Sequence, residues 1–130
     1  MRHHKVGSRA EYRQQADQRA QESESLAVKF KKLKALMVEL SYFNGDGVSR
    51  SSQIKYKVNL ENARSVFRFN CLNSECVRGD FDLSEELAGA VAARRKLVSG
   101  ELACQGWRNQ NTVDTVRCQN ILRYKFTLEY

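Results

Sequence analysis

The last ten residues of the chain, ILRYKFTLEY at 121–130, alternate apolar and polar side chains without interruption. The apolar positions are Leu122, Tyr124, Phe126, Leu128 and Tyr130, and the polar positions between them are Arg123, Lys125, Thr127 and Glu129. Successive side chains of a β-strand point to opposite faces, so this pattern predicts a strand with one buried face and one solvated face. Strands of this kind are typical of antiparallel sheets.

Two earlier segments show the same alternation. In SQIKYKVNL at 52–60 the apolar positions are Ile54, Tyr56, Val58 and Leu60. In VFRFNC at 66–71 the positions on one face are Phe67, Phe69 and Cys71, and Arg68 lies on the other. Shorter strands are expected in ELACQGW at 101–107 and in TVRCQNI at 115–121. Together these segments predict a small antiparallel sheet.

The segment between residues 26 and 43 supports two interpretations. A heptad spacing, typical of a helix that pairs with another helix, joins Leu26, Phe30, Leu33, Met37 and Leu40. A strand alternation joins Leu36, Val38, Leu40 and Tyr42. We expect a helix that ends near residue 32, a strand over 35–43 and a turn in FNGDG at 43–47.

Two helices are predicted outside this segment. Residues 8–31 are rich in Ala, Gln, Glu and Arg and have few apolar side chains, so we expect a helical arm that projects from the domain. Residues 81–100 begin with a possible N-cap at Asp82 or Ser84, and Gly100 is expected to follow the last turn. Their apolar stripe, expected to pack on the sheet, comprises Leu83, Leu87, Ala90, Val91 and Val98.

These elements predict an α+β fold, with a small antiparallel sheet, one packed helix and an N-terminal helical arm. We expect residues 1–32 to form a basic arm that is helical or partly disordered. Residues 33–130 are expected to form one compact domain that contains all four cysteines. The N-terminal MRHHKVGSRAEYRQQ is basic and polar, and no apolar stretch is long enough to span a membrane, so a cytoplasmic protein is expected.

The net charge of +7 is concentrated toward the N-terminus. Residues 1–34 contribute +5, residues 35–70 contribute +2, and residues 71–130 contribute zero. A basic arm of this kind suits an anionic partner such as nucleic acid, and it equally suits solubility alone.

The four cysteines are the most specific chemical feature of the sequence. Cys71 and Cys76 are expected in one turn, while Cys104 and Cys118 would have to meet across a hairpin. Four thiolates are the donor set of structural zinc, and a reducing compartment disfavours disulfides. We therefore expect one structural zinc ion on Cys71, Cys76, Cys104 and Cys118, with free thiols and disulfides as alternatives. A glycine often follows the second cysteine of such a turn, and here only Gly79 and Gly106 could have that role.

Basic side chains occupy the polar positions of the predicted strands. If these strands adjoin, one surface would carry Lys55, Lys57, Arg68, Arg123 and Lys125. Such a surface can bind phosphates without reading bases, and the alternative is an ordinary solvated sheet face. Trp107 and Arg108 could add stacking contacts to a base, although a tryptophan here is also typical of a core or rim position.

No set of residues suggests an enzyme. His3 and His4 are the only histidines, and neither is near a cysteine in sequence. We therefore expect a non-enzymatic binding module with a structural zinc site that contacts nucleic acid or another anionic partner. The alternative is a protein-interaction or dimerisation domain that uses the amphipathic segment 26–40. The pattern resembles zinc ribbons in general outline, and this resemblance implies no function.

Overall fold

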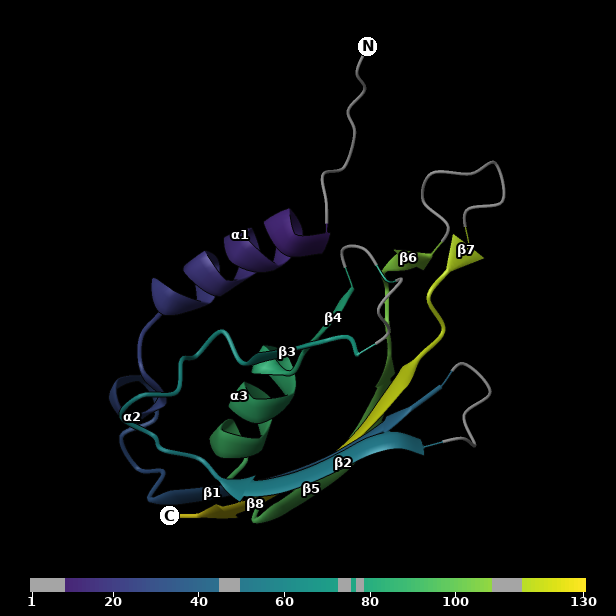
Figure 1. Ribbon diagram of the computed structural model, residues 1–130. Helices are drawn as coiled ribbons and strands as arrows, with labels where there is room; N and C mark the ends of the chain where they lie inside the picture. The colour runs from purple at the N-terminus through teal and green to yellow at the C-terminus, as the bar shows by residue number, and fades with distance from the viewer. Residues whose placement is uncertain (1–8, 45–49, 73–75, 77–78, 109–115) are drawn as a thin grey trace.

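A four-stranded antiparallel sheet is the largest element of the computed structural model, which describes residues 9–44, 50–72, 76, 79–108 and 116–130 (Figure 1). Its strands, in spatial order, are β2 (Arg50–Lys57), β1 (Ala35–Phe43), β8 (Ile121–Glu129) and β5 (Leu97–Ala103). The strands β1 and β8 pair along their whole length, from Ala35 opposite Glu129 to Phe43 opposite Ile121. The predicted antiparallel sheet and the strand over 35–43 are therefore confirmed.

The alternation in sequence becomes an alternation in burial. Along β1 the buried side chains are Leu36, Val38, Leu40 and Tyr42, and along β8 they are Leu122, Tyr124, Phe126 and Leu128. The residues between them are exposed or half-buried. One face of the sheet therefore forms the core, and the other face, called the outer sheet face below, carries the polar positions of the same strands.

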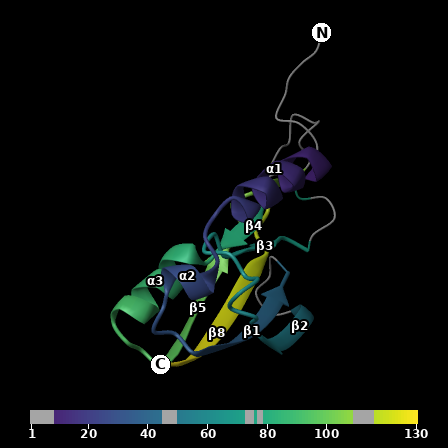
Figure 2. The ribbon, with the colours of Figure 1, turned by 90° about the vertical axis from the view of Figure 1, so that its left-hand side faces the viewer.

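Helix α3 (Ser84–Ala92) packs on the buried face of the sheet, and the short helix α2 (Leu26–Lys29) lies on the same side (Figures 1 and 2). Leu87 and Ala90 of α3 join the apolar cluster that also contains Phe126 and Leu36. The mixed α+β architecture is thus an antiparallel sheet with helices on one face, and none of the described helices is long and apolar enough to cross a membrane.

Helix α3 is shorter than the sequence predicts. The backbone of Arg94 has a φ angle of 56°, in the left-handed region, and this conformation ends the helix after Ala92. The amides of Arg94 and Arg95 donate to the carbonyls of Val91 and Ala90, which closes the last turn. The prediction that Gly100 ends this helix is wrong, because residues 97–103 form the edge strand β5.

The N-terminal region forms two helices instead of one. Helix α1 (Arg9–Gln21) is followed by a turn and then by α2, whose N-cap Ser25 accepts a hydrogen bond from the amide of Val28 at 3.2 Å. Leu26 is fully buried in the core, and its amide donates to the carbonyl of Ala63. Packing therefore begins before residue 33, where the sequence places the domain boundary. Residue 8, at which the predicted helix begins, lies outside the described residues.

The heptad interpretation of residues 26–40 is wrong. Leu26 lies in α2, whereas Met37 and Leu40 lie on opposite faces of β1. A strand reverses its face at every residue, so these positions cannot form one continuous helical seam. The buried leucines of this segment pack inside the chain itself.

Two short strand pairs extend beyond one end of the sheet. One consists of β3 (Arg68–Asn70) and β4 (Asp80–Asp82), and the other consists of β6 (Trp107–Arg108) and β7 (Val116–Arg117). The pair β6–β7 continues the hairpin of β5 and β8 in the same register, since Ala103 faces Ile121 and Trp107 faces Arg117. These two pairs position the cysteines.

Candidate metal centre

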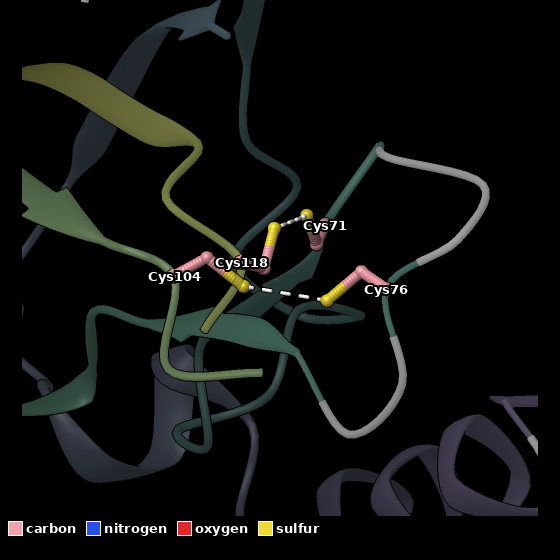
Figure 3. Close-up of side chains that lie close together, drawn as sticks. All are labelled: Cys71, Cys76, Cys104 and Cys118. Atoms are coloured by element: carbon pink, nitrogen blue, oxygen red, sulfur yellow. Dashed lines mark hydrogen bonds between the residues drawn. The ribbon is translucent and has the colours of Figure 1, made fainter. Parts of the chain in front are cut away.

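The four cysteines converge from three separate segments of the chain (Figure 3). Cys71 directly follows β3, Cys76 lies between β3 and β4, Cys104 lies between β5 and β6, and Cys118 lies between β7 and β8. Every cysteine is at most 3% exposed. Their sulfur atoms all lie within 4.8 Å of one another and point toward a common centre (Figure 3).

The spacing of the sulfur atoms suits a tetrahedral metal ion. The sulfur of Cys71 lies 3.7 Å from that of Cys118, and the sulfur of Cys76 lies 3.6 Å from that of Cys104. Four sulfurs bound to zinc at about 2.3 Å stand about 3.8 Å apart at the corners of a tetrahedron. The cluster could therefore hold a metal ion with only small adjustments of the side chains.

The long hairpin places Cys104 and Cys118 on the same side as the core. The amide of Cys104 donates to the carbonyl of Asn120 at 2.8 Å, and the amide of Cys118 donates to the carbonyl of Gly106 at 2.8 Å. These bonds continue the ladder between the paired strands, so both cysteines keep the alternation of β5 and β8. The expectation that this pair meets across a hairpin is confirmed.

Two glycines leave room for the sulfur atoms. A Cβ atom on Gly79 or on Gly106 would lie closer than 3.0 Å to the sulfur of Cys76. On Gly106 it would also lie 2.7 Å from the backbone nitrogen of Gly79, which cannot move aside as a flexible side chain can. The amide of Gly106 donates to the sulfur of Cys104 at 3.4 Å, a contact that stabilises a thiolate. The sequence suggested these glycines, and only the fold shows that both contact the same cysteine.

The clustered thiols resist ionisation when no cation is near them. The hydrogen bond from Cys104 lowers the pKa of Cys76, but the hydrogen bond with Cys71, burial and the charges of Cys71 and Cys118 together raise it to about 12. Hydrogen bonds to Cys71 and Cys76, followed by burial, raise the pKa of Cys104. A bound dication would supply the missing positive charge, so metal binding here would release protons.

Helix α1 contacts the residues beside the cysteine cluster, and nothing in the sequence indicated that it would. Arg13 donates to the carbonyl oxygen of Cys71 at 2.9 Å. Arg68 contacts Asp80 at 2.7 Å and Asp17 of α1 at 2.9 Å, and its side chain is only 4% exposed. Ala16 of α1 is buried. Helix α1 therefore packs against the β3–β4 segment, which carries Cys71, instead of projecting from the domain.

The buried position of Arg68 changes the predicted basic surface. The small sheet β3–β4 is separate from the four-stranded sheet, so Arg68 does not share the outer sheet face. Asp80, the partner of Arg68, lies in β4. Including Arg68 in the basic face is therefore a wrong prediction, because its guanidinium is already satisfied by carboxylates inside the fold.

The remaining four cations do share the outer sheet face. Lys55 of β2 and Lys125 of β8 both stand opposite Glu39 of β1, and Lys57 stands opposite Met37. The three lysines form no ion pair or side-chain hydrogen bond with any residue that the structure describes. A hollow of about 240 Å³ opens between Glu39, Lys55 and Lys125.

The fourth cation, Arg123, is already engaged by its neighbours. It contacts Glu101 at 3.2 Å and lies over the ring of Phe43, with 4.4 Å between the guanidinium carbon and the ring centroid. The half-buried Trp107 lies in β6, which belongs to a separate two-stranded sheet. The side chain of Arg108 and the residues His3 and His4 lie outside the part of the chain that the structure describes.

Comparisons with protein-family models, with curated proteins and with solved structures find no match to this chain. The function is therefore inferred from the residues and their geometry alone.

Proposed function

We propose that this chain is a non-enzymatic binding module whose fold is completed by one structural zinc ion on Cys71, Cys76, Cys104 and Cys118. The observation that carries the proposal is the convergence of four buried sulfur atoms within 4.8 Å of one another. Soft thiolates select zinc among the abundant divalent metals, and a tetrahedral four-sulfur set is its usual structural site.

A structural role fits this donor set better than a catalytic role. A catalytic zinc normally keeps one coordination position open for water, whereas four thiolates occupy all positions of a tetrahedron. The ion would join the loop between β3 and β4 to the hairpin that carries Cys104 and Cys118. Because thiols need a reducing compartment to stay available for metal, we also propose a cytoplasmic location.

Metal content tests this proposal directly. Protein purified without added metal should contain about one zinc per chain by elemental analysis, and its native mass should include one zinc. A Cys71→Ser, Cys118→Ser double variant should contain none, while a Ser41→Ala variant on the outer sheet face should retain the ion. Absence of zinc from the wild-type protein, or four thiols that react freely in the native fold, would refute the proposal.

The outer sheet face supports a second proposal, the binding of an anionic polymer such as nucleic acid. Its supporting observation is that Lys55, Lys57 and Lys125 are all exposed and lack ion-pair partners within the described ranges. Lysines on a flat face contact phosphates by charge alone, so we propose weak, sequence-tolerant binding. Glu39 lies between Lys55 and Lys125 and reduces this attraction.

Titration with single-stranded and duplex oligonucleotides at low salt tests the second proposal. Replacing Lys55, Lys57 and Lys125 by Gln should weaken binding and flatten its salt dependence. The matched control replaces three other exposed lysines, Lys31, Lys32 and Lys34, by Gln. These lysines precede the sheet, and the control variant has the same net charge as the test variant. Equal loss in both variants, or no binding by the wild type, would contradict a role for this face.

A further inference from the structure

The four-stranded sheet has two edge strands, and these differ in how they are protected (Figure 1). Strand β2 carries the exposed Lys55 and Lys57, and its pairing with β1 shifts register between Tyr42 and Phe43. Lysines and irregular pairing are devices by which an edge strand avoids joining further strands. Strand β5, at the other edge, has the sequence LVSGELA, which contains no lysine, arginine or proline. Strand β5 therefore lacks the protection that β2 has.

The backbone of β5 presents a regular row of hydrogen-bonding groups at its edge. Its pairing with β8 runs from Leu97 to Ala103 without a shift of register. Just beyond the strand, the amide of Cys104 donates to the carbonyl of Asn120. Hydrogen-bonded residues alternate along an antiparallel ladder, so the even-numbered residues of β5 bond to β8. The N–H and C=O groups that point to the open edge therefore belong to Leu97, Ser99, Glu101 and Ala103.

This edge is accessible to another strand. Among the described residues, β5 pairs with β8 alone, and Leu97, Ser99 and Glu101 are exposed. The side chain of Gln105 donates to the carbonyl of Ala103 at 3.3 Å, and that oxygen keeps a second lone pair. A strand added to β5 would thus find hydrogen-bonding partners along the whole length of its edge.

The core side of β5 suits a second copy of the same strand. Two antiparallel copies related by a two-fold axis at Gly100 place Val98 opposite Leu102 of the second copy, so two apolar side chains meet. Leu102 is half-buried in the single chain, and this pairing would cover it further. Facing residues that exchange no hydrogen bonds approach to about 4.5 Å between Cα atoms, and Gly100 places no side chain there. The ring of Tyr124 already occupies that space, since a Cβ atom on Gly100 would lie 2.6 Å from its hydroxyl oxygen.

The outer side of β5 is self-complementary in the same register. Leu97, which is 56% exposed, would lie opposite Ala103 of the second copy. Ser99 would lie opposite Glu101, whose Oε1 contacts Arg123 at 3.2 Å. A carboxylate accepts several hydrogen bonds, so Glu101 can accept one from the serine hydroxyl as well. Each pair therefore joins two apolar or two polar side chains, which stabilises strand pairing.

The neighbouring registers match less well. An axis at Glu101 would place the two copies of this carboxylate directly opposite each other, and like charges in that position destabilise a strand pair. An axis at Ser99 would place Leu97 opposite Glu101. The side chains therefore select the register centred on Gly100.

From these observations we infer that β5 pairs with β5 of a second copy of this chain, antiparallel and about a two-fold axis at Gly100. The two four-stranded sheets then form one continuous sheet, with the outer sheet faces of both copies on the same side. An interface of one strand pair is small, so the dimer is weak and reversible. The inference uses neither the cysteines nor the lysines of the outer sheet face, and it is independent of both proposals above.

Sedimentation equilibrium of the full-length protein, from about 10 μM to about 1 mM, tests the inference and should show a monomer–dimer equilibrium. Ser99→Pro removes one outward N–H from each copy, hence two bonds from the interface, and should weaken dimerisation at least about tenfold. The bonds between β5 and β8 do not use this N–H, and proline is tolerated at such edge positions. Gln53→Pro is the matched control. It removes an outward N–H from β2, where the amide of Val58 bonds to Leu36 and odd-numbered residues face outward. It should leave dimerisation unchanged.

NMR of the wild-type protein tests the register without any substitution. Val98 and Leu102 of one copy are about 13 Å apart along the strand, so a nuclear Overhauser effect between their methyl groups arises only between copies. It should be present where the dimer dominates and disappear on dilution. Over the same range the amides of Ser99 and Glu101 should gain protection from exchange, while that of Gly100, which faces β8, stays protected throughout.

Three results would overturn the inference. One is a monomer at every concentration up to about 1 mM, which would leave a strand of another protein as the occupant of this edge. Another is undiminished dimerisation of Ser99→Pro with an amide spectrum that otherwise matches the wild type. The third is a wild-type dimer without the contact between Val98 and Leu102, and this measurement decides the matter if Ser99→Pro does not fold.

Discussion

The sheet core and the cysteine end of this protein are stabilised in different ways. In the sheet core, β1 and β8 have nine residues each and pair along their whole length over a continuous apolar cluster. At the cysteine end, β3 and β4 have three residues each and β6 and β7 have two. Isolated two-stranded hairpins of this size are marginal in water. The cysteine end therefore needs a cross-link that the sheet core does not need.

This difference shows how a chain of 130 residues can combine two sources of stability. Burial of apolar area increases with the length of an alternating strand, so long strands stabilise themselves by packing. A metal ion instead concentrates its stabilisation at one point and joins segments that share few apolar contacts. The following experiments test that division, beginning with the largest expected effect.

Metal removal should separate the two regions most clearly. Apparent zinc-binding energies reach about 10 kcal/mol or more, so chelation should loosen the cysteine end completely. Amide exchange should lose its protection in β3, β4 and around Cys118, while β1 and β8 remain protected. Loss of protection at equal rates everywhere would show that the two regions unfold as one unit.

Truncation of a core side chain should affect the whole domain. Phe126 is fully buried and its ring contacts that of Phe67, so Phe126→Ala should cost about 3–5 kcal/mol in the free energy of unfolding. Thr127→Ala, one residue further along β8 and on the outer sheet face, should change it by less than about 0.5 kcal/mol. Denaturant titration measures both variants, and similar losses would contradict the assignment of faces.

Replacement of a glycine by alanine should have opposite effects at the cysteine cluster and in helix α3. Gly106→Ala forces a Cβ atom against Cys76 and Gly79, so zinc affinity should fall about ten- to one-hundredfold, as it does for disturbed surroundings of metal ligands. Gly89→Ala has open space around the new atom and should stabilise α3 by up to about 1 kcal/mol. Competition with a chelator of known affinity measures the first effect. Unchanged zinc affinity in Gly106→Ala would show that the cluster can rearrange.

Deletion of residues 1–22 should have the smallest effect. It removes the bonds from Arg13 to Cys71 and from Asp17 to Arg68 but spares Leu26. Each such bond is worth about 1 kcal/mol, and Asp17 is largely exposed, so the domain should stay folded and lose about 1–2 kcal/mol. Cooperative thermal unfolding and zinc content should both persist. Their loss would make α1 an essential part of the cysteine end.

The sequence predicted elements whose pattern is local. Strand β8 and the strand over 35–43 follow from side-chain alternation, which depends only on neighbouring positions. The end of α3 could not be predicted in this way, because Arg94 adopts a conformation that glycine usually adopts. The sequence also placed Arg68 on a solvated face, because alternation alone does not show which strands share a sheet.

The candidate metal site divides in the same manner. The number of cysteines and the absence of nearby histidines determined the donor set, because ligand chemistry belongs to the residues themselves. The side-chain alternation that runs into β8 likewise determines that Cys104 and Cys118 point to the same face of their hairpin. Only the tertiary structure decided that Cys71 and Cys76 meet this pair and that Gly79 and Gly106 leave room for them. Distances between segments far apart in the chain depend on how the whole core packs, and no local pattern encodes that packing.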